Sequence, residues 1–445
     1  MISLKPFGKY TKTLMNLAEG GNQMQVKALK KAKPVAPSDV KALRQSVEQI
    51  LERVKEEGDA ALRYYSKTFD KYEGPFLVGE KEIEAAKNEL PDDIIEGLDF
   101  AIERVTAFAE AQRAQIKEFE QEMIPGVFMG HRLVPVDSCA AYVPAGRYPC
   151  LTSAVMSLAP AKVAGVKRVV ACSSPGKQKR INPAILYTMA KIGADEIYCL
   201  GGAQAIAAMA FGTETISPVD LIVGPGNQYV AEAKRQVFGT VGIDFLAGPS
   251  ECLVIADETA RADYIAADLL AQCEHDPEAR GALVTTSEEL GKEVLKEIER
   301  QLGDLQTEEV ARRSWENKGD VVVAKTIEDA CAWANDWAPE HLEVHTKDPK
   351  ALLPLLTSYG SLFLGETAAE VFADKVAGTN HILPTLRGAR YTGGLWVGHF
   401  LKVITHQWVE ERGMKVLAPY SVRQAEFETM DAHRRAALIR LTNKL

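Results

Sequence analysis

The sequence lacks an apolar run long enough to cross a bilayer, which takes about 20 consecutive apolar residues. Met1 to Gly20 is polar and has no apolar signal-peptide segment. Basic residues are not in excess, because 52 Lys and Arg stand against 61 Asp and Glu, a net charge of −9. We therefore expect a cytoplasmic protein with neither nucleic acid nor a membrane as partner.

Cysteine is also scarce. The seven cysteines are an odd number, widely spaced and without a CxxC pair, and most lie beside Val, Ala or Leu. Buried free thiols are the expected state, with a catalytic cysteine as the alternative. What is present is ordinary for a globular protein: 445 residues, 46% hydrophobic and 25% charged. That length predicts two or three domains.

The first third of the chain is predicted to be helical. Ser38-Asp39 caps a segment whose apolar residues recur at helical spacing through Val54. A second helix is expected over 60–68 and a long one from about 91 to 123. From about 385 to the end, the pattern predicts a small, separate helical unit.

Strands alternate with helices in the middle of the chain. This alternation predicts parallel, doubly wound sheets. The segments with strand character are 140–143, 166–172, 196–200, 221–223, 252–256, 282–285 and 320–324.

Two histidine groups could do chemistry. Gln272 and His275 are three residues apart near a helix end, so they share a helical face and, with a carboxylate, would suit zinc. Alone this spacing is weak, since such a histidine is usually a cap or a surface residue. Glu340 and His341 follow a proline-broken helix and form a possible acid/base pair. The alternative there is a strand with His341 and His345 on one face.

Three further segments are ambiguous on residues alone. Residues 370–381, with Asp374 and His381, are typical of a site loop. Glu428 and His433 are five apart on an expected C-terminal helix, where solvated side chains are the default. Residues 224–227 end a strand before a helix, where backbone N–H groups can approach a phosphate, although the segment is not GxGxxG.

Five segments, taken together and in this order, resemble the histidinol dehydrogenase family. They are Val223-Gly-Pro-Gly-Asn227, Val241-Gly-Ile-Asp244 with Ala247-Gly-Pro-Ser-Glu251, Ala271-Gln-Cys-Glu-His-Asp276, Pro339-Glu-His-Leu-Glu343 and Ala377-Gly-Thr-Asn-His381. The resemblance covers roughly residues 35 to 440. It implies a zinc- and NAD-dependent dehydrogenase that oxidises a small primary alcohol.

The resemblance also implies a metal site and an acid/base pair. One zinc per subunit would be held by Gln272, His275 and Asp374, with His433 supplied by the partner subunit of a swapped homodimer. His341 would accept the alcohol proton during hydride transfer. Glu340 would activate the water that attacks the aldehyde, and a second hydride transfer would give the carboxylate.

Further matched positions would bind substrate and cofactor. The substrate positions are Ser250, His381 and Glu428. The NAD positions are Tyr142, Gln204 and Asn227.

The implied architecture is α/β, with two incomplete doubly wound, Rossmann-like parallel-sheet domains. An N-terminal helical arm spans 1–34, and a C-terminal helical dimerisation domain spans 385–445. The NAD-binding domain would be 141–250. The remaining domain, carrying most metal ligands, would combine 35–140 with 251–384.

The family resemblance leaves the substrate open. Three segments resemble a branch that oxidises 2,3-dihydroxypropane-1-sulfonate (sulfopropanediol): 358–366, 373–375, and 389–394 with 400–402. A sulfonate needs fixed cations, which Arg147, Lys375 and Arg390 would supply. Lys375 could instead only pair with Asp374. Histidinol itself stays an alternative because Glu428, which pairs with an amine in the family, is retained; a related amino or polyol alcohol is another.

Overall fold

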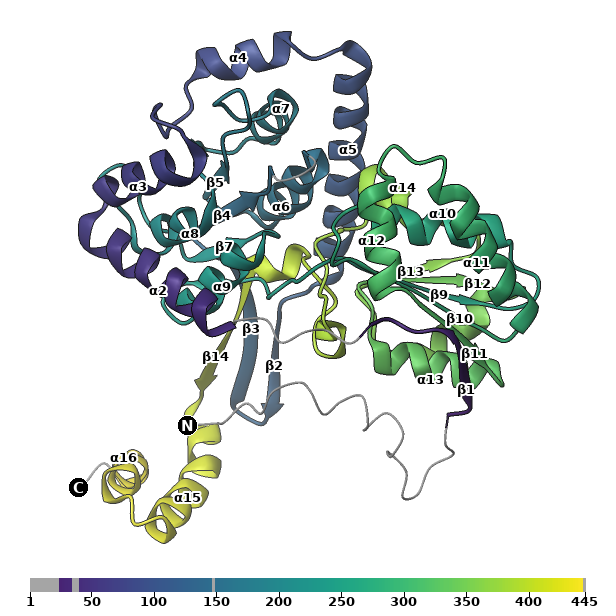
Figure 1. Cartoon of the computed structure of the whole chain (residues 1–445). Helices are drawn as coiled ribbons and strands as arrows, with labels where there is room; N and C mark the ends of the chain where they lie inside the picture. Colours follow the sequence, from purple (N-terminus) through teal and green to yellow (C-terminus); the bar gives the residue numbers. More distant parts are fainter. Residues whose placement is uncertain (1–23, 34–39, 146–148, 443–445) are drawn as a thin grey trace.

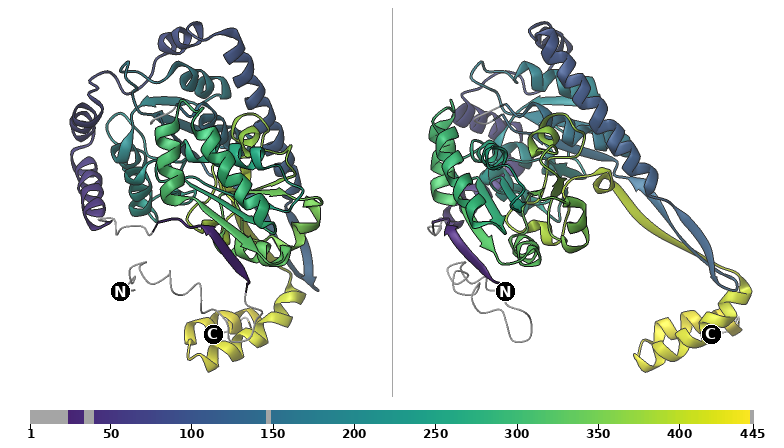
Figure 2. Two further views of the ribbon diagram at one scale, coloured as in Figure 1. Left: turned by 45° about the vertical axis from the view of Figure 1, so that its right-hand side comes forward. Right: turned by 90° about the vertical axis from the view of Figure 1, so that its right-hand side faces the viewer.

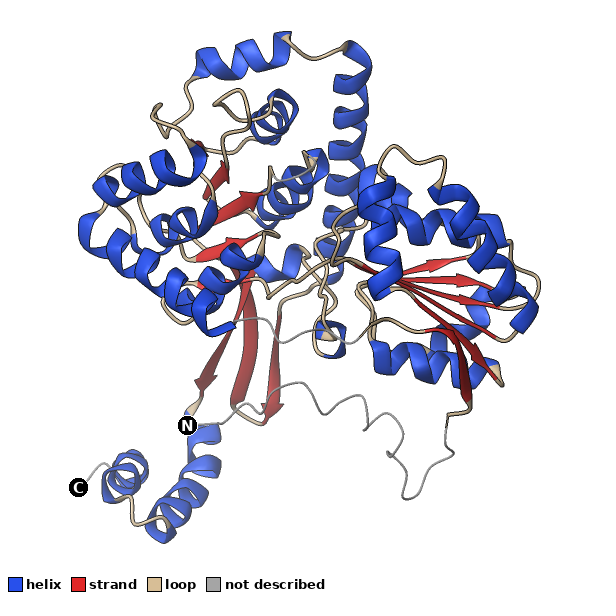
Figure 3. Ribbon diagram, viewed as in Figure 1, coloured by secondary structure: helices blue, strands red, loops and turns tan. Residues whose placement is uncertain are grey.

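The computed structural model describes residues 24–33, 40–145 and 149–442 (Figure 1). Two sheets lie side by side, each with helices on both faces, and a three-stranded ribbon carries the last helices away from them (Figure 3). The prediction of an α/β fold with two largely parallel sheets is confirmed. No helix within the described ranges is long and apolar enough to cross a membrane.

The first sheet has five strands in the order β6-β5-β4-β7-β8, and all of its pairings are parallel. Small residues let the central helix α6 pack closely on it, so most of α6 is buried. The strands are β4 (Ser138–Val143), β5 (Arg168–Ser173), β6 (Glu196–Cys199), β7 (Leu221–Val223) and β8 (Gly242–Ile243). The helices between them are α6 (Leu151–Ala164), α7 (Pro183–Ile192), α8 (Gly202–Phe211) and α9 (Gln228–Val237).

The helices of the first third pack against the helices that cover this five-stranded sheet. Helix α2 contacts α8 and α9, and its Val47, Leu51 and Val54 share one core with β4 and β5. The domain division predicted from the sequence combines 35–140 with 251–384. The domain boundaries stay a prediction. The elements are α2 (Val40–Glu57), α3 (Asp59–Tyr65), a π-helical turn (Ser66–Asp70), α4 (Glu80–Asn88) and α5 (Asp92–Gln115).

The second sheet has six strands in the order β1-β11-β10-β9-β12-β13. Only β1 runs antiparallel, so part of the expected N-terminal helical arm is an edge strand. The strands are β1 (Val26–Lys30), β9 (Glu251–Ala256), β10 (Arg280–Thr285), β11 (Asp320–Ala324), β12 (His341–His345) and β13 (Ser361–Leu364). Its helices are α10 (Ala262–Cys273), α11 (Glu288–Leu302), α12 (Glu308–Lys318), α13 (Ile327–Trp337) and α14 (Glu370–Lys375).

The ribbon corrects two predictions. The long helix ends at Gln115 rather than near 123, and 401–409 is a strand rather than part of a helical unit. Residues 119–124 and 401–409 both pair with β3. Phe128 of β3 stacks on Trp408 with ring centroids 3.8 Å apart. The ribbon consists of β2 (Phe119–Ile124), β3 (Val127–Pro135) and β14 (Leu401–Val409), followed by α15 (Glu411–Phe427) and α16 (Asp431–Thr442). Short 3-10 helices span Pro349–Leu355, Gly388–Arg390 and Val397–Phe400.

Candidate active site between the two sheets

The candidate catalytic pair lies where β12 begins. His341 is the first residue of the strand and pairs in register with Cys252 near the start of β9, so Ser250 reaches the same edge of the sheet. The α6 side chains of Thr152 and Ser153 bond to this edge from the other half of the molecule. Thr152 donates to the Asp374 carbonyl at 2.8 Å, and Ser153 Oγ lies 3.1 Å from His381 Nε2. The site is therefore built between the two halves.

Glu340 is buried beside its strand and is held by a backbone donor. Its Oε2 accepts from Glu251 N at 2.8 Å. Burial raises the pKa of Glu340 well above its usual range, although the Glu251 N–H opposes that change. Burial therefore biases this carboxyl group toward its protonated form.

His341 is a neutral imidazole at ordinary pH. Burial lowers its pKa to about 3, against the opposing charge of Asp374. Its Nε2 lies 3.6 Å from Glu370 Oε1 and 3.9 Å from Glu340 Oε2, while Nδ1 is buried without a hydrogen-bond partner. A neutral ring with an unused nitrogen can accept a proton.

The predicted metal ligands Gln272, His275 and Asp374 share one environment. Gln272 is 1% exposed, and its Oε1 has no hydrogen-bond partner, which costs free energy unless a ligand uses that oxygen. Burial lowers the pKa of His275, with Asp374 acting in the opposite direction. Neutral imidazole nitrogen, amide oxygen and carboxylate form a donor set that zinc accepts, so these residues fit a zinc ion.

Asp374 is kept ionised by its neighbours. Burial alone would raise its pKa, but His381 and Lys375 hold that pKa well below its usual range. His381 Nδ1 lies 2.9 Å from Asp374 Oδ1, and the Lys375 ammonium forms an ion pair with the other carboxylate oxygen. Asp374 is therefore available as an anionic ligand, and Lys375 neutralises part of its charge.

The single chain does not bring Glu428 and His433 to this site. The prediction that both lie on one helix is wrong, because α15 ends before Glu428 and Thr429, at a φ of 57°, turns the chain into α16. Figure 2 shows α15 and α16 at the far end of the ribbon, away from both sheets.

The predicted cofactor residues lie around the carboxyl ends of the parallel strands β4, β6 and β7, where α/β sheets bind ligands. The Tyr142 hydroxyl accepts from Gly202 N at 3.2 Å. Gln204 Nε2 donates to Asp70 Oδ2 at 3.4 Å. Asn227 caps α9, since its Oδ1 accepts from Tyr229 N and Val230 N.

A buried ion pair and its hydrogen bonds hold the turn after β7 in place. Lys234 and Asp244 form an ion pair, and both side chains are almost completely buried. Lys234 Nζ donates to Gly224 O at 2.9 Å, and Gly224 N donates to Asp244 Oδ2 at 2.8 Å. Gly224 has a φ of +112° and lies against the Tyr142 backbone, where a Cβ would come within 2.1 Å of the carbonyl oxygen. This brace positions the turn that carries Asn227.

The substrate cations predicted from the sequence are only partly placed. Lys375 lies beside Asp374, whereas Arg390 is exposed on a 3-10 turn. Arg147 lies outside the described residues. Six of the seven cysteines are buried, and burial raises the pKa of the Cys139 and Cys172 thiols to about 12, which argues against a catalytic thiolate there.

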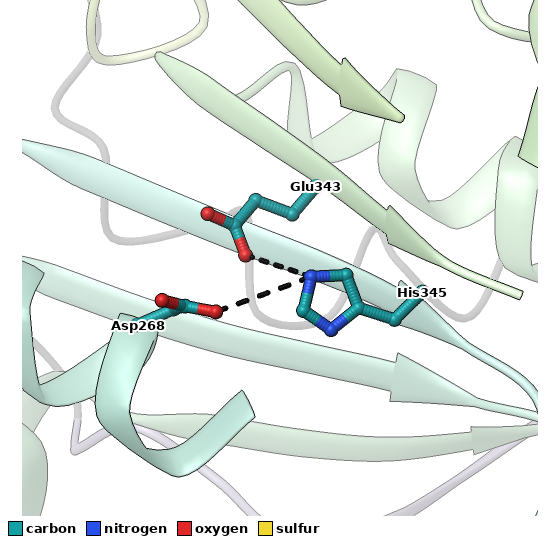
Figure 4. Close-up of side chains that lie close together, drawn as sticks. All are labelled: Asp268, Glu343 and His345. Carbon is teal, nitrogen blue, oxygen red and sulfur yellow. Dashed lines mark ion pairs between the residues drawn. The ribbon is translucent and has the colours of Figure 1, made fainter. Parts of the chain in front are cut away.

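Two residues of the site lie in segments that the sequence singled out, 370–381 and 247–251, but their contacts with the catalytic pair were not predicted. Glu370 and Glu251 contact the catalytic pair through bonds between distant segments. The sequence did give an indication of Glu343 and His345. The alternating strand considered there as the alternative is present as β12. It turns both side chains toward α10, where they meet Asp268 (Figure 4).

The comparisons with known proteins agree with this geometry. The family model described as histidinol dehydrogenase matches residues 34–441. The chain belongs to the histidinol dehydrogenase family. It is therefore an enzyme, a zinc- and NAD-dependent dehydrogenase that oxidises an alcohol to an acid.

Named relatives differ in their substrates. The chain is 46% identical to a histidinol dehydrogenase homolog of Shouchella clausii, over 89% of this chain and 94% of the relative. It is 44% identical to histidinol dehydrogenase of Rhizobium meliloti, over 89% and 91%. It is 40% identical to sulfopropanediol 3-dehydrogenase of Ruegeria pomeroyi, over 94% and 97%. The crystal structure of histidinol dehydrogenase from Elizabethkingia anophelis superposes with a TM-score of 0.89 at 35% identity, over 99% and 97%.

Proposed function

We propose that the enzyme oxidises a small anionic primary alcohol, of the 2,3-dihydroxypropane-1-sulfonate type, through the aldehyde to the carboxylate. The observation that carries the chemistry is the buried pair Glu340 and His341 beside Asp374, with one residue biased toward its protonated form and the other neutral. Such a pair offers two separate groups that take up and release protons, one for each oxidation.

Each residue of the pair has a separate role. His341 receives the hydroxyl proton on its free ring nitrogen as the alcohol becomes an aldehyde. In the second oxidation Glu340 acts from its ionised form, which the Glu251 N–H stabilises, and it takes a proton from the attacking water. Bound zinc, held by Gln272, His275 and Asp374, supplies Lewis-acid polarisation of the alcohol oxygen, and bound NAD+ supplies the hydride acceptor. Tyr142, Gln204 and Asn227 hold the cofactor.

The inference that the substrate is an anion depends on Lys375. Burial alone would lower its pKa, but the Asp374 carboxylate raises it, so the ammonium stays charged next to a metal-ligand carboxylate. Its side chain is still 62% exposed and can turn toward a bound sulfonate. Arg147 and Arg390 would add further cations, while Ser250 and His381 would line the alcohol end. Histidinol is the second candidate, because a 44% identical relative is named for it and Glu428 is retained.

The active site is completed by a second copy of the chain. Helix α15 exposes large apolar side chains, with Phe427 91% exposed and Tyr420 61% exposed, at the end of an extended ribbon. Such a surface needs a partner. A swapped homodimer would cover it and bring His433 and Glu428 to the other subunit's site, with His433 as the fourth zinc ligand.

A substrate panel tests the proposed specificity. The purified enzyme would be assayed for NADH formation with 2,3-dihydroxypropane-1-sulfonate, L-histidinol and uncharged diols. We expect kcat/KM for the sulfonate to exceed that for histidinol at least ten-fold. Lys375→Met should raise KM for the sulfonate about ten-fold, since a hydrogen bond to a charged group contributes about 1.5–3 kcal/mol. Lys292→Met removes a comparably exposed, ion-paired lysine and is the control. Preference for histidinol would reverse the assignment.

Subunit mixing tests the shared site. His341→Ala and His433→Ala chains should each be inactive, and co-refolded mixtures should recover activity in mixed dimers only if His433 acts in the other subunit. Absence of recovery would indicate a site built within one chain.

A further inference from the structure

A second buried cluster of possible metal ligands lies on α10 and β12, the strand that begins with His341. Asp268 on α10 faces Glu343 and His345 on β12, and the three ligand atoms all lie within 4.8 Å of one another (Figure 4). His345 Nε2 is 3.1 Å from Glu343 Oε2 and 4.0 Å from Asp268 Oδ2. The cluster is distinct from the proposed zinc ligands.

Three polar atoms of this cluster are buried without a hydrogen-bond partner, whereas Glu343 Oε1 accepts from Glu370 N at 2.8 Å. Glu343 is 0% exposed and His345 is 1% exposed, yet Glu343 Oε2 and both ring nitrogens of His345 lack hydrogen-bond partners. Within the part of the chain that is described, no lysine or arginine forms an ion pair with Asp268 or Glu343. Two neighbouring buried carboxylates without a cation are costly, so a bound cation or a retained proton must compensate them.

We propose that Asp268, Glu343 and His345 bind a second divalent transition-metal ion, separate from the active-site zinc. Two carboxylate oxygens and one imidazole nitrogen suit a borderline cation such as Zn2+. The alternative compensation is a shared proton: burial and the Glu343 carboxylate raise the pKa of Asp268 to about 9 in the metal-free protein. A cation would replace that proton and use the orphaned imidazole as well.

The ion would have a structural role, because it would link α10 to β12. Asp268 lies one turn before Gln272 on α10, and His345 lies four residues after His341 on β12. Linking Asp268 to His345 therefore fixes α10, which carries Gln272 and ends two residues before His275, against the strand that carries the proposed base. The strand rise places His345 roughly 13 Å along the chain from His341. The proposed second ion would therefore lie away from the proposed acid/base pair.

Metal analysis of the full-length enzyme tests the proposal. The chelator-stripped protein is reloaded with Zn2+, passed through a desalting column and analysed by mass spectrometry. We expect about two equivalents per subunit in the wild type and in the control Asp263→Asn, which alters an exposed carboxylate of the same helix. Asp268→Asn and His275→Ala should each retain about one. One equivalent in the wild type that Asp268→Asn keeps and His275→Ala loses would overturn the proposal and leave the proposed function intact.

A second measurement isolates this centre from the active site. In the His275→Ala background, added Zn2+ should still raise the thermal midpoint, and adding His345→Gln should abolish that rise. His345→Gln removes the imidazole without removing a carboxylate, so it serves if Asp268→Asn fails to fold. An equal rise in the single and double variants would overturn the proposal. One equivalent lost on Asp268→Asn but kept in His275→Ala would support this centre and contradict the zinc ligands of the proposed function.

Discussion

Removing the buried cation under the turn after β7 should damage both stability and cofactor binding. Lys234→Met leaves the Asp244 carboxylate buried without its partner and removes the donor to Gly224 O. Breaking a buried pair on one side costs about 3–5 kcal/mol. For a unit of the size of the five-stranded half, this lowers the thermal midpoint by roughly 6–20 °C. Because the turn carries Asn227, KM for NAD should rise as well.

Two companion variants sharpen this test. Lys234→Met with Asp244→Asn removes both charges and should recover more than half of the lost stability. Lys67→Met breaks a pair whose side chains are 66% and 69% exposed, and it should cost about 0–1 kcal/mol. Thermal unfolding and NAD titration of all three variants form the assay. If Lys234→Met matched Lys67→Met in both readouts, the bracing role would be refuted.

Three further predictions follow from the geometry. Gly224→Ala should abolish NAD binding, whereas Gly239→Ala, also at positive φ but with open space, should cost only backbone strain; isothermal titration compares them. Burial raises the pKa of Glu251 to about 7, so its contribution to stability is complete below about pH 4.5 and is lost as the pH rises through 7. Between pH 5 and 8 the free energy of unfolding should therefore fall less in Glu251→Gln than in the wild type. The difference should be up to about 3 kcal/mol, measured by thermal unfolding. Chelation should abolish NADH formation and Zn2+ should restore it, while activity that survives complete zinc removal would contradict the metal role.

Local patterns in the middle of the chain were sufficient for the fold. The strands at 221–223 and 252–256 follow from apolar runs that need no distant partner. The ribbon was missed for the opposite reason. Residues 119–124 and 401–409 become strands by pairing with β3, and 401–409 is nearly 300 residues from it in sequence.

The site divides in the same way. Spacing marked Gln272 and His275 as candidates, and the place after a proline marked Glu340 and His341, but only the family resemblance assigned roles to them. The Glu370 carboxylate near His341 and the Thr152 bond to Asp374 join segments far apart in sequence, and no local pattern signals them. Whether His433 completes the metal site depends on a second chain, which no property of a single sequence segment specifies.

The stoichiometry of oxidation tests the central claim most directly. The enzyme, supplied with excess NAD+ and limiting 2,3-dihydroxypropane-1-sulfonate, should form about two NADH for each alcohol consumed and leave the carboxylate as product. Glu340→Gln should reduce this ratio toward about one as the aldehyde accumulates, because the second oxidation needs the activated water. A wild-type ratio of one, or no NADH with this substrate, would contradict the account.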